Sequence, residues 1–436
     1  MKRVTILILF LALFYNLEVQ GQEQVAITKS EVLTRVSEHN TSIKISEEDF
    51  KQAKADFKQT NAVFLPNITA SHTAMATTNP LMAFGSKLNQ EILTQNDFSP
   101  ALLNDPSQIE NYATKFEIQQ PLINMDGMYQ RKAAKSKMEA MSLKTERTQD
   151  YLAFEVEKAY MQLQLAYKAV AVLETALEAA NANKELADNS LKQGYLQRAD
   201  VLNVEVRVTE VQNQLQSANS NVENASNYLS FLMSDDTYVI YTPADELKLA
   251  AVEIEDQIIS ENRSDIKAMQ LSTEAYEAMN KADKMAFLPR LNAFGSYELY
   301  DDQIFQADAN GYVFGAQLSW DIFQGSKRFG KAQKSKSEYE KSKLEYKQYV
   351  SQSNLELNKA KRAFIDAENK LKLNRLALAQ SEESLRIRTN RFKEGLEKTS
   401  DLLIAETQYA QKQLEYYQTI FEYNYAQAYL QFLTKE

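Results

Sequence analysis

The chain has 436 residues, a formal net charge of −10 and no cysteine. The acidic balance argues against a nucleic-acid or anionic-lipid surface as partner, and the lack of cysteine excludes disulfide bonds. Only ten glycines and seven prolines interrupt the sequence. Because these residues punctuate local structure, their scarcity predicts very long uninterrupted elements.

Residues 1–21 have the pattern of a secretory signal peptide. Lys2 and Arg3 form a short basic start, and an apolar run follows from Val4 to Tyr15. Small residues up to Gly21 then offer a cleavage site. The run is shorter than the ~20 apolar residues that a bilayer-spanning helix needs, so we expect cleavage and export. No later stretch is apolar enough for a membrane helix, so strands would have to provide any membrane part.

The remaining sequence is duplicated. Phe64-Leu65-Pro66 returns as Phe287-Leu288-Pro289, each before an alternating segment. A period of roughly two hundred residues is too long for a solenoid repeat. We therefore expect two copies of one large unit, a first repeat at 22–235 and a second at 263–436, joined by a connector at 236–262. Within this connector, residues 237–241 resemble a short strand.

Each repeat is read as helix, strand, loop, strand, long helix, turn and long helix. The first helix of the first repeat is expected from Ser30 to Thr60. Strands are expected at about 64–78, 112–124, 287–300 and 311–323, because apolar and polar residues alternate there with a period of two. The loop between the first two strands is longer than its counterpart in the second repeat. We expect an exposed, variable outer loop there.

Aromatic residues concentrate on these alternating segments: Tyr112, Phe116, Tyr297, Tyr312, Phe314 and Trp320. The apolar face of such strands can meet either a protein core or lipid. Aromatic girdles with polar inward faces are typical of outer-membrane barrels. Four strands cannot close a barrel, and lipid does not tolerate open sheet edges. The strands therefore predict a barrel shared between several chains.

The helices that follow the strands are long. No proline or glycine occurs between Gly127 and about Asn189, or from Lys331 to about Arg391. A helix of roughly 60 residues would measure about 90 Å. Small and apolar residues recur with a three-four spacing from Val156, and in the second repeat from Leu357, which predicts a coiled-coil seam. Gly194 and Gly395 end the outgoing helices, so hairpin tips are expected near 194–200 and 395–401.

The order of these motifs, found twice, resembles the TolC-like outer membrane efflux proteins. The resemblance rests on Phe-Leu-Pro before a strand, a glycine-bearing strand-to-helix joint (Gly127; Gly325) and a glycine-to-aspartate hairpin tip. It covers essentially the whole mature chain. It implies a mostly α fold with a membrane β-barrel part, in which a homotrimer gives four strands per chain to a 12-stranded barrel and continues it as a periplasmic α-helical tunnel.

The resemblance also implies a function and a location. The protein would be a passive exit duct in the outer membrane, in contact with its lipid and with a long periplasmic extension. Its partners would be a periplasmic adaptor protein and an inner-membrane pump of the RND or ABC type. In that family the hairpin tips close the periplasmic entrance.

Several residues of this chain fall on the family's tip positions: Gly194, Gly395, Asp200 and Asp401. Three copies of Asp401 around a symmetry axis would form an acidic ring, a recurring device for cation selectivity. An aspartate in the first turn of a helix is also a good cap or dipole partner. The sequence leaves both roles open.

At the same tips the chain departs from the family pattern. Ile404 stands where the second aspartate is expected, Glu397 where an arginine is expected, and Phe392 in place of a tyrosine. Arg198 of the first repeat is a candidate to supply the cation of an interchain pair instead.

We predict no enzymatic activity, cofactor or metal site. The two histidines, His39 and His72, are far apart, and no cysteine or glycine-rich phosphate loop is present. Energy would have to come from a partner. The alternative interpretation is a structural protein, either a periplasmic coiled-coil adaptor or a surface-attached stalk. Adaptors usually carry glycine-rich lipoyl-like domains, and a stalk has no need of four alternating strands.

Overall fold

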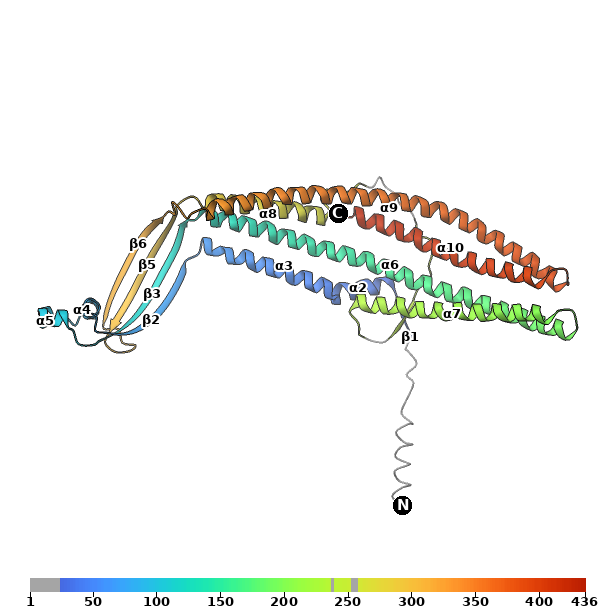
Figure 1. Ribbon diagram of the computed structural model, residues 1–436, viewed down its shortest axis with the longest axis horizontal. Coiled ribbons are helices and arrows are strands. Elements are labelled where there is room, and N and C mark those ends of the chain that lie inside the picture. The colour runs from blue at the N-terminus through green and yellow to red at the C-terminus, as the bar shows by residue number, and fades with distance from the viewer. Residues whose placement is uncertain (1–23, 237–238, 252–257) are drawn as a thin grey trace, which may run out of the picture. The chain divides into compact units, whose positions relative to one another are not determined.

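The computed structural model describes residues 24–236, 239–251 and 258–436 (Figure 1). The predicted signal peptide lies outside the described residues, as do Thr237 and Tyr238 of the predicted connector strand. The chain divides into two compact units. The sheet unit comprises Glu48–Leu143 and Asp265–Gln348, and the helical unit comprises the segment ending at Glu47, Lys144–Ser264 and Tyr349–Glu436. Each unit takes segments from both sequence repeats, so the repeats are not the compact units.

The sheet unit contains a four-stranded antiparallel sheet with the order β2-β3-β5-β6. The strands are β2 (Asn67–Thr77), β3 (Ile109–Ile123), β5 (Arg290–Asp301) and β6 (Ala309–Ser319). Each lies within a few residues of its expected range. β2 and β6 are edge strands, and each has only one neighbour among the described strands.

The segment between β2 and β3 is more structured than the exposed loop expected from the sequence. It forms the helix α4 (Pro80–Asn89), the 3-10 helix η2 (Gln95–Phe98) and the short helix α5 (Pro100–Asn104). Asn79 caps α4 by accepting a hydrogen bond from the Met82 amide at 3.2 Å, and Pro80 occupies the first helical turn, where its missing N–H has no cost.

Two very long helices run through both units, α6 (Met125–Lys192) and α9 (Lys327–Lys393). Each is followed by a shorter return helix, α7 (Arg198–Met233) and α10 (Thr399–Thr434). Figure 1 shows α7 running back along α6 and α10 along α9. The sheet unit also holds the 3-10 helix η1 (Thr60–Val63) and α8 (Ser264–Met285). No helix in the described ranges is both long and apolar enough to cross a membrane.

The predicted coiled-coil seams form the core of the helical unit. Val156 and Leu163 of α6 are fully buried against residues of α7 such as Leu229. Leu357 and Phe364 of α9, 201 positions later in each case, are buried against α10. Burying such side chains contributes about 1.5–3 kcal/mol each, so the seams hold each hairpin together.

The first expected helix, Ser30 to Thr60, is divided in two. α2 (Lys29–His39) and α3 (Thr41–Gln59) meet at Asn40. The Asn40 side chain accepts from the amide of Ser42 at 2.8 Å and donates to the carbonyl of Leu232 at 2.7 Å. The prediction of one continuous helix was wrong because this contact with α7 fixes a break.

A small parallel sheet completes the helical unit. β1 (Gln24–Ile27), which the sequence did not indicate, pairs with β4 (Ile240–Pro243) of the predicted connector. The single O–H of Tyr160 of α6 is shared between two acceptors, the carboxylate of Asp245 at 2.5 Å and the carbonyl of Ile27 at 3.1 Å. Burial raises the pKa of this tyrosine, so it stays a neutral donor. The connector is thus attached to α6 by specific polar contacts.

Candidate functional site

One face of the four-stranded sheet carries a row of exposed aromatic residues. The register places Phe116, Tyr297 and Tyr312 directly opposite one another on β3, β5 and β6. Phe314, two residues further along β6, stacks on Tyr312 with ring centroids 6.2 Å apart. Tyr312 is 73% exposed and Phe314 80%. An apolar aromatic face without a cover in its own chain is what an outward face toward lipid requires. We call it the aromatic face.

The opposite face of the same sheet is polar. Lys115 of β3 lies between Glu117, at 3.2 Å, and Glu298 of β5, at 3.4 Å. The neighbouring positions on β2 are Ser71, Thr69 and Thr73. These side chains point away from the aromatic face because successive residues of a strand alternate. This polar face suits a water-filled interior.

Two of the predicted girdle residues lie apart from the row. Tyr112 is on the aromatic face but pairs with Asp301, near the end of the sheet that carries α4. Trp320 lies beyond the end of β6, so its assignment to a strand was wrong. Its indole Nε1 donates to the carbonyl of Phe287 at 2.9 Å, and this contact fixes it at the opposite end.

The repeated Phe-Leu-Pro motif has the same contacts in both copies. The carbonyl of Phe64 accepts a hydrogen bond of 2.9 Å from the side chain of Gln120. In the second copy, the carbonyl of Phe287 accepts one of 2.9 Å from the indole of Trp320. A guanidinium lies over each ring, that of Arg131 at 5.8 Å from Phe64 and that of Arg328 at 4.4 Å from Phe287. The motif therefore joins the end of one strand to the start of a long helix in two ways: the phenylalanine carbonyl accepts a side-chain hydrogen bond, and the phenylalanine ring makes a cation–π contact with an arginine.

A second contact ties strand to helix within the sheet unit. Arg290, the first residue of β5, contacts Asp126 in the first turn of α6 with both carboxylate oxygens, at 3.1 Å and 2.5 Å. Asp126 is buried, whereas Arg290 is half exposed. A bidentate pair of this kind fixes orientation as well as charge. Gly127 follows, and any larger residue there would contact Asn124 and Val63 at 2.8 Å.

Both hairpin tips end their outgoing helix with a left-handed glycine. Gly194 has φ +80° and Gly395 has φ +72°. In each tip the glycine amide donates to the carbonyl of the residue three positions earlier. The amide of the next residue donates to the carbonyl five positions before itself, from Tyr195 to Ser190 and from Leu396 to Arg391. This is the Schellman ending of a helix. The duplicated glycines therefore have a defined conformational role.

The two tip aspartates lie in equivalent first turns but differ in contacts. Asp200 of α7 accepts from the backbone amide of Gln197 at 3.1 Å, which makes it part of a capping box. Asp401 of α10 is partly exposed, and among the described residues its side chain contacts only the hydroxyl of Ser400, at 3.5 Å. A capping role thus accounts for Asp200, and Asp401 has a carboxylate available for other contacts.

Glu397, which replaces the arginine expected at the tip, is held by two arginines of its own hairpin. Arg388 lies 2.6 Å and Arg391 2.8 Å from its carboxylate oxygens. The hydrogen bond from Arg391 and the charge of Arg388 lower the pKa of Glu397. The change from arginine to glutamate therefore has a compensating partner within the α9–α10 turn.

The other tip residues named from the sequence do not form a cluster in one chain. Arg198 pairs with Glu205 of its own helix, with 3.6 Å between nitrogen and oxygen. Ile404 is exposed on α10, and Phe392 is partly buried, with its carbonyl accepting from the amide of Gly395 at 3.0 Å.

A contact between the two hairpins was not found by sequence reasoning. Asn183 of α6 donates a hydrogen bond to Glu406 of α10, and the charge of Arg207 on α7 also acts on this carboxylate. Burial raises the pKa of Glu406, an effect larger than the opposing influence of Arg207 and Asn183. Glu406 stands in the second repeat where Glu205 stands in the first, five residues after the tip aspartate in each case, but nothing in the sequence indicates that Glu406 is buried.

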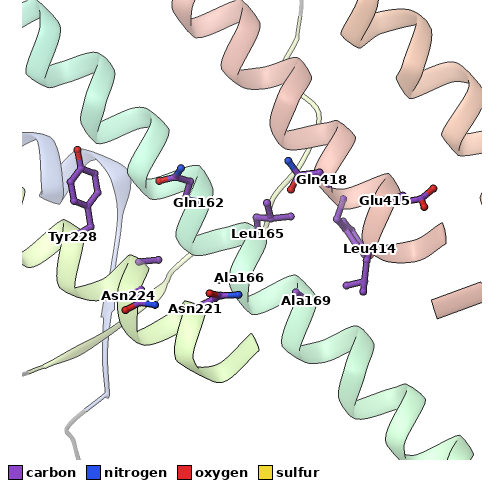
Figure 2. Close-up of a pocket in the computed structure, with 12 residues that line it drawn as sticks. Gln162, Leu165, Ala166, Ala169, Asn221, Asn224, Tyr228, Leu414, Glu415 and Gln418 are labelled. Carbon is purple, nitrogen blue, oxygen red and sulfur yellow. The ribbon is translucent and has the colours of Figure 1, made fainter. Parts of the chain in front are cut away.

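A groove of about 660 Å³ lies between α6, α7 and α10, and Figure 2 shows the side chains that line it. Amide side chains from all three helices line it, among them Gln162, Asn221 and Gln418. Glu415, the one charged residue of its lining, is paired with Lys412 at 2.6 Å. Within the described ranges, no group of three or more histidine, cysteine or acidic residues is placed to hold a metal ion.

A family model described as "Outer membrane efflux protein" matches residues 32–234 and 257–434. The chain belongs to the outer membrane efflux protein family. The match includes both repeats and leaves out most of the connector. No curated protein sequence matched the chain.

Solved structures agree with this efflux protein in fold. The Campylobacter jejuni CmeC outer membrane channel has a TM-score of 0.81 at 15% identity, covering 96% of this chain and 90% of that chain. CusC has a TM-score of 0.81 at 14% identity, covering 94% and 92%. The open-state Neisseria gonorrhoeae MtrE outer membrane channel has 0.78 at 16% identity, covering 93% and 88%.

These findings confirm the predicted family, fold class and location. The efflux protein has the fold of trimeric outer membrane channels, with strands for a shared barrel and helices for a periplasmic tunnel, and it acts as an outer membrane export channel. Its family is one of channel proteins that work with an adaptor and an inner-membrane pump. The alternatives, a periplasmic adaptor or a surface-attached structural protein, are set aside.

Proposed function

We propose that three copies of this efflux protein close one 12-stranded barrel and act as a passive exit duct. The observation that carries the proposal is the sheet with two open edges, β2 and β6, an aromatic face and a polar face. Unpaired strand edges are not stable in lipid. Pairing β6 of one copy with β2 of the next satisfies both edges, and the aromatic face then meets the outer membrane lipid.

The duct depends on partner proteins for the energy of export. The sequence has no phosphate-binding loop, and we infer that the energy for export comes from an inner-membrane pump of the RND or ABC type, coupled through a periplasmic adaptor. Co-purification from the native membrane with a pump and an adaptor tests this assignment. Recovery of the trimer without either partner under conditions that preserve such complexes would contradict it.

We further propose that Asp401 contributes to the periplasmic constriction. Its carboxylate is partly exposed at a helix start near the tip, and none of the described residues places a cationic group beside it. Three such carboxylates around an axis would favour cations. Ile404, one turn further along α10, is exposed and would add an apolar surface near the same axis. Arg198, Glu397 and Phe392 would shape the surrounding tip.

Planar lipid bilayers provide the test of both proposals. The purified protein should run as a heat-modifiable trimer and give discrete conductances, whereas a soluble monomer without conductance would contradict the duct. Asp401→Ala should lower cation selectivity and raise conductance. Asp200→Asn is the control, because Asp200 acts in a capping box. Unchanged selectivity and leak in Asp401→Ala would remove Asp401 from the constriction and leave the duct intact.

A further inference from the structure

The helix α4 belongs to the segment that is present in the first repeat and has no counterpart in the second. It has two different faces. Ala83, Ser86 and Gln90 on one side are buried. On the other side, Leu81 and Leu88 are 81% and 56% exposed and lie seven residues apart, so they share one helix face. With Met82, which is also exposed, they form the apolar stripe of α4.

The buried side of α4 contacts the polar face of the sheet. Gln90 at its end donates to the side chain of Asn111 at 2.9 Å and to the carbonyl of Asp301 at 3.0 Å. Asn111 and Ala309 are buried, and the register places both on the same face as Lys115. α4 therefore covers the polar face at the end of the sheet where β2 stops.

This placement decides which way the apolar stripe points. In the barrel proposed above, the polar face is the interior, because the aromatic face meets lipid. Since Gln90 on the buried side of α4 is hydrogen-bonded to Asn111 on the polar face, the opposite side points toward the barrel axis. Gly85 lies between Leu81 and Leu88 on that side, and a Cβ added there would meet no atom within 4 Å beyond the adjacent residues and backbone of its own helix. The stripe is thus apolar, uncovered and open to close approach.

In a symmetric trimer, the other two copies of α4 are placed to cover the apolar stripe. Only Thr78 and Asn79 separate the end of β2 from α4, and α4 also contacts β6. Suppose that β6 of one copy pairs with β2 of the next copy. The α4 of the second copy, which follows its β2, then starts beside the β6 of the first copy, and that β6 is also in contact with the α4 of the first copy. Repeating this three times brings the three stripes together around the axis.

We propose that the three copies of α4 meet at the outer mouth of the duct and form an apolar constriction, with the stripes of the other two copies as the partners of Leu81, Met82 and Leu88. The proposal rests on the trimeric duct proposed above. Hydrophobic constrictions control permeation by excluding water from a narrow passage. The contact is small, with a few side chains from each copy, so it is suited to opening when cargo arrives. A lipid partner does not fit the stripe, because lipid lies on the other face of the sheet.

Cysteine cross-linking tests the contact directly, since the chain has no cysteine of its own. Leu81→Cys in the detergent-solubilised trimer should form a disulfide on mild oxidation. The product should be a covalent dimer and a free monomer, because three equivalent thiols can form only one pair. Phe305→Cys is the matched control. Phe305 is exposed at the same end of the sheet, but its ring stacks on His72 of the aromatic face at 4.6 Å.

Conductance gives the second measurement. Leu81→Ser combined with Leu88→Ser should raise the single-channel conductance in planar bilayers about twofold or more, and Phe305→Ser should leave it unchanged. A trimer that conducts, shows no Leu81→Cys cross-link and keeps its conductance in the double variant would overturn the constriction but not the duct. A fluorophore attached to the Leu81→Cys thiol gives a further check. Its quenching by brominated acyl chains would place the stripe against lipid and would also overturn the constriction. Absence of any trimer or conductance in the unaltered protein would refute the duct itself.

Discussion

The side-chain amide of Asn183 on α6 donates a hydrogen bond to the carboxylate of Glu406 on α10, and this bond connects the two helical hairpins of one chain. The second carboxylate oxygen of Glu406 is buried without a hydrogen-bond partner among the described residues. Burial holds the pKa of Glu406 above its ordinary value of 4.5. The charged form is therefore tolerated because Asn183 and the nearby Arg207 stabilise it.

Replacing Asn183 should loosen this connection in a pH-dependent way. A raised pKa means that the folded state holds the proton more tightly, so the stabilisation is present at low pH and is lost as the pH rises through the folded value. Asn183→Ala removes a donor to the charged form and should cost about 1–3 kcal/mol at pH 8 and less at pH 5. Hydrogen exchange of the amides around residues 183 and 406 measures this. Asn181→Ala, exposed on the same helix, is the control, and an equal cost at both pH values would contradict the interpretation.

Much of the fold could be predicted because its signals are local. The long helices follow from the absence of glycine and proline, and the observed ends of α6 and α9 differ from the expected ones by only a few residues. The left-handed conformations of Gly194 and Gly395 explain why glycine recurs at both tips. The alternation in β3, β5 and β6 placed Phe116, Tyr297 and Tyr312 on one face, where the register has them.

The missed features depend on partners far away in the sequence. The helix break at Asn40 is fixed by the carbonyl of Leu232, 192 residues later. β1 is four residues long and exists through its pairing with β4. The burial of Glu406 depends on which helix faces meet between the hairpins. No local pattern carries this information, and none marks the end of β6 at Ser319, one residue before Trp320.

The α9–α10 turn should lose rigidity when Glu397 is neutralised. The pKa of Glu397 is lowered by Arg391 and Arg388, so its charged form stabilises the turn above the ordinary pKa of 4.5, and this stabilisation is lost as the pH falls. Glu397→Gln should speed amide exchange at residues 395–399 at pH 7, with a smaller difference from the unaltered protein below pH 4.5. Glu394→Gln, at an exposed position of the same turn, should have no effect. The same acceleration in both variants would show that the arginine contacts are not responsible.

The joint between β5 and α6 should depend on the charge pair of Asp126 and Arg290. Arg290→Gln leaves a buried carboxylate without its partner and should cost about 1–3 kcal/mol, the lower end being expected because Arg290 is half exposed. Adding Asp126→Asn should recover part of this loss, since no unpaired charge then remains. The temperature at which the trimer dissociates in detergent measures both variants. Strictly additive losses in the double variant would contradict a direct coupling.

Two exposed glycines, one at a hairpin tip and one inside a helix, offer a pair of substitutions with opposite expected signs. Gly395 has φ +72° and open space around it, so Gly395→Ala should destabilise the tip by about 1–2 kcal/mol through backbone strain alone. Gly330 lies within α9, is exposed, and also has open space around it. Because alanine favours the helix over glycine, Gly330→Ala should instead stabilise α9 by about 0.5–1 kcal/mol. Amide exchange near each position gives both values. Gly395→Asn should destabilise the tip less than Gly395→Ala does, because asparagine tolerates the left-handed region. If Gly395→Ala slowed exchange as Gly330→Ala does, the left-handed helix ending would not be what requires glycine at this tip.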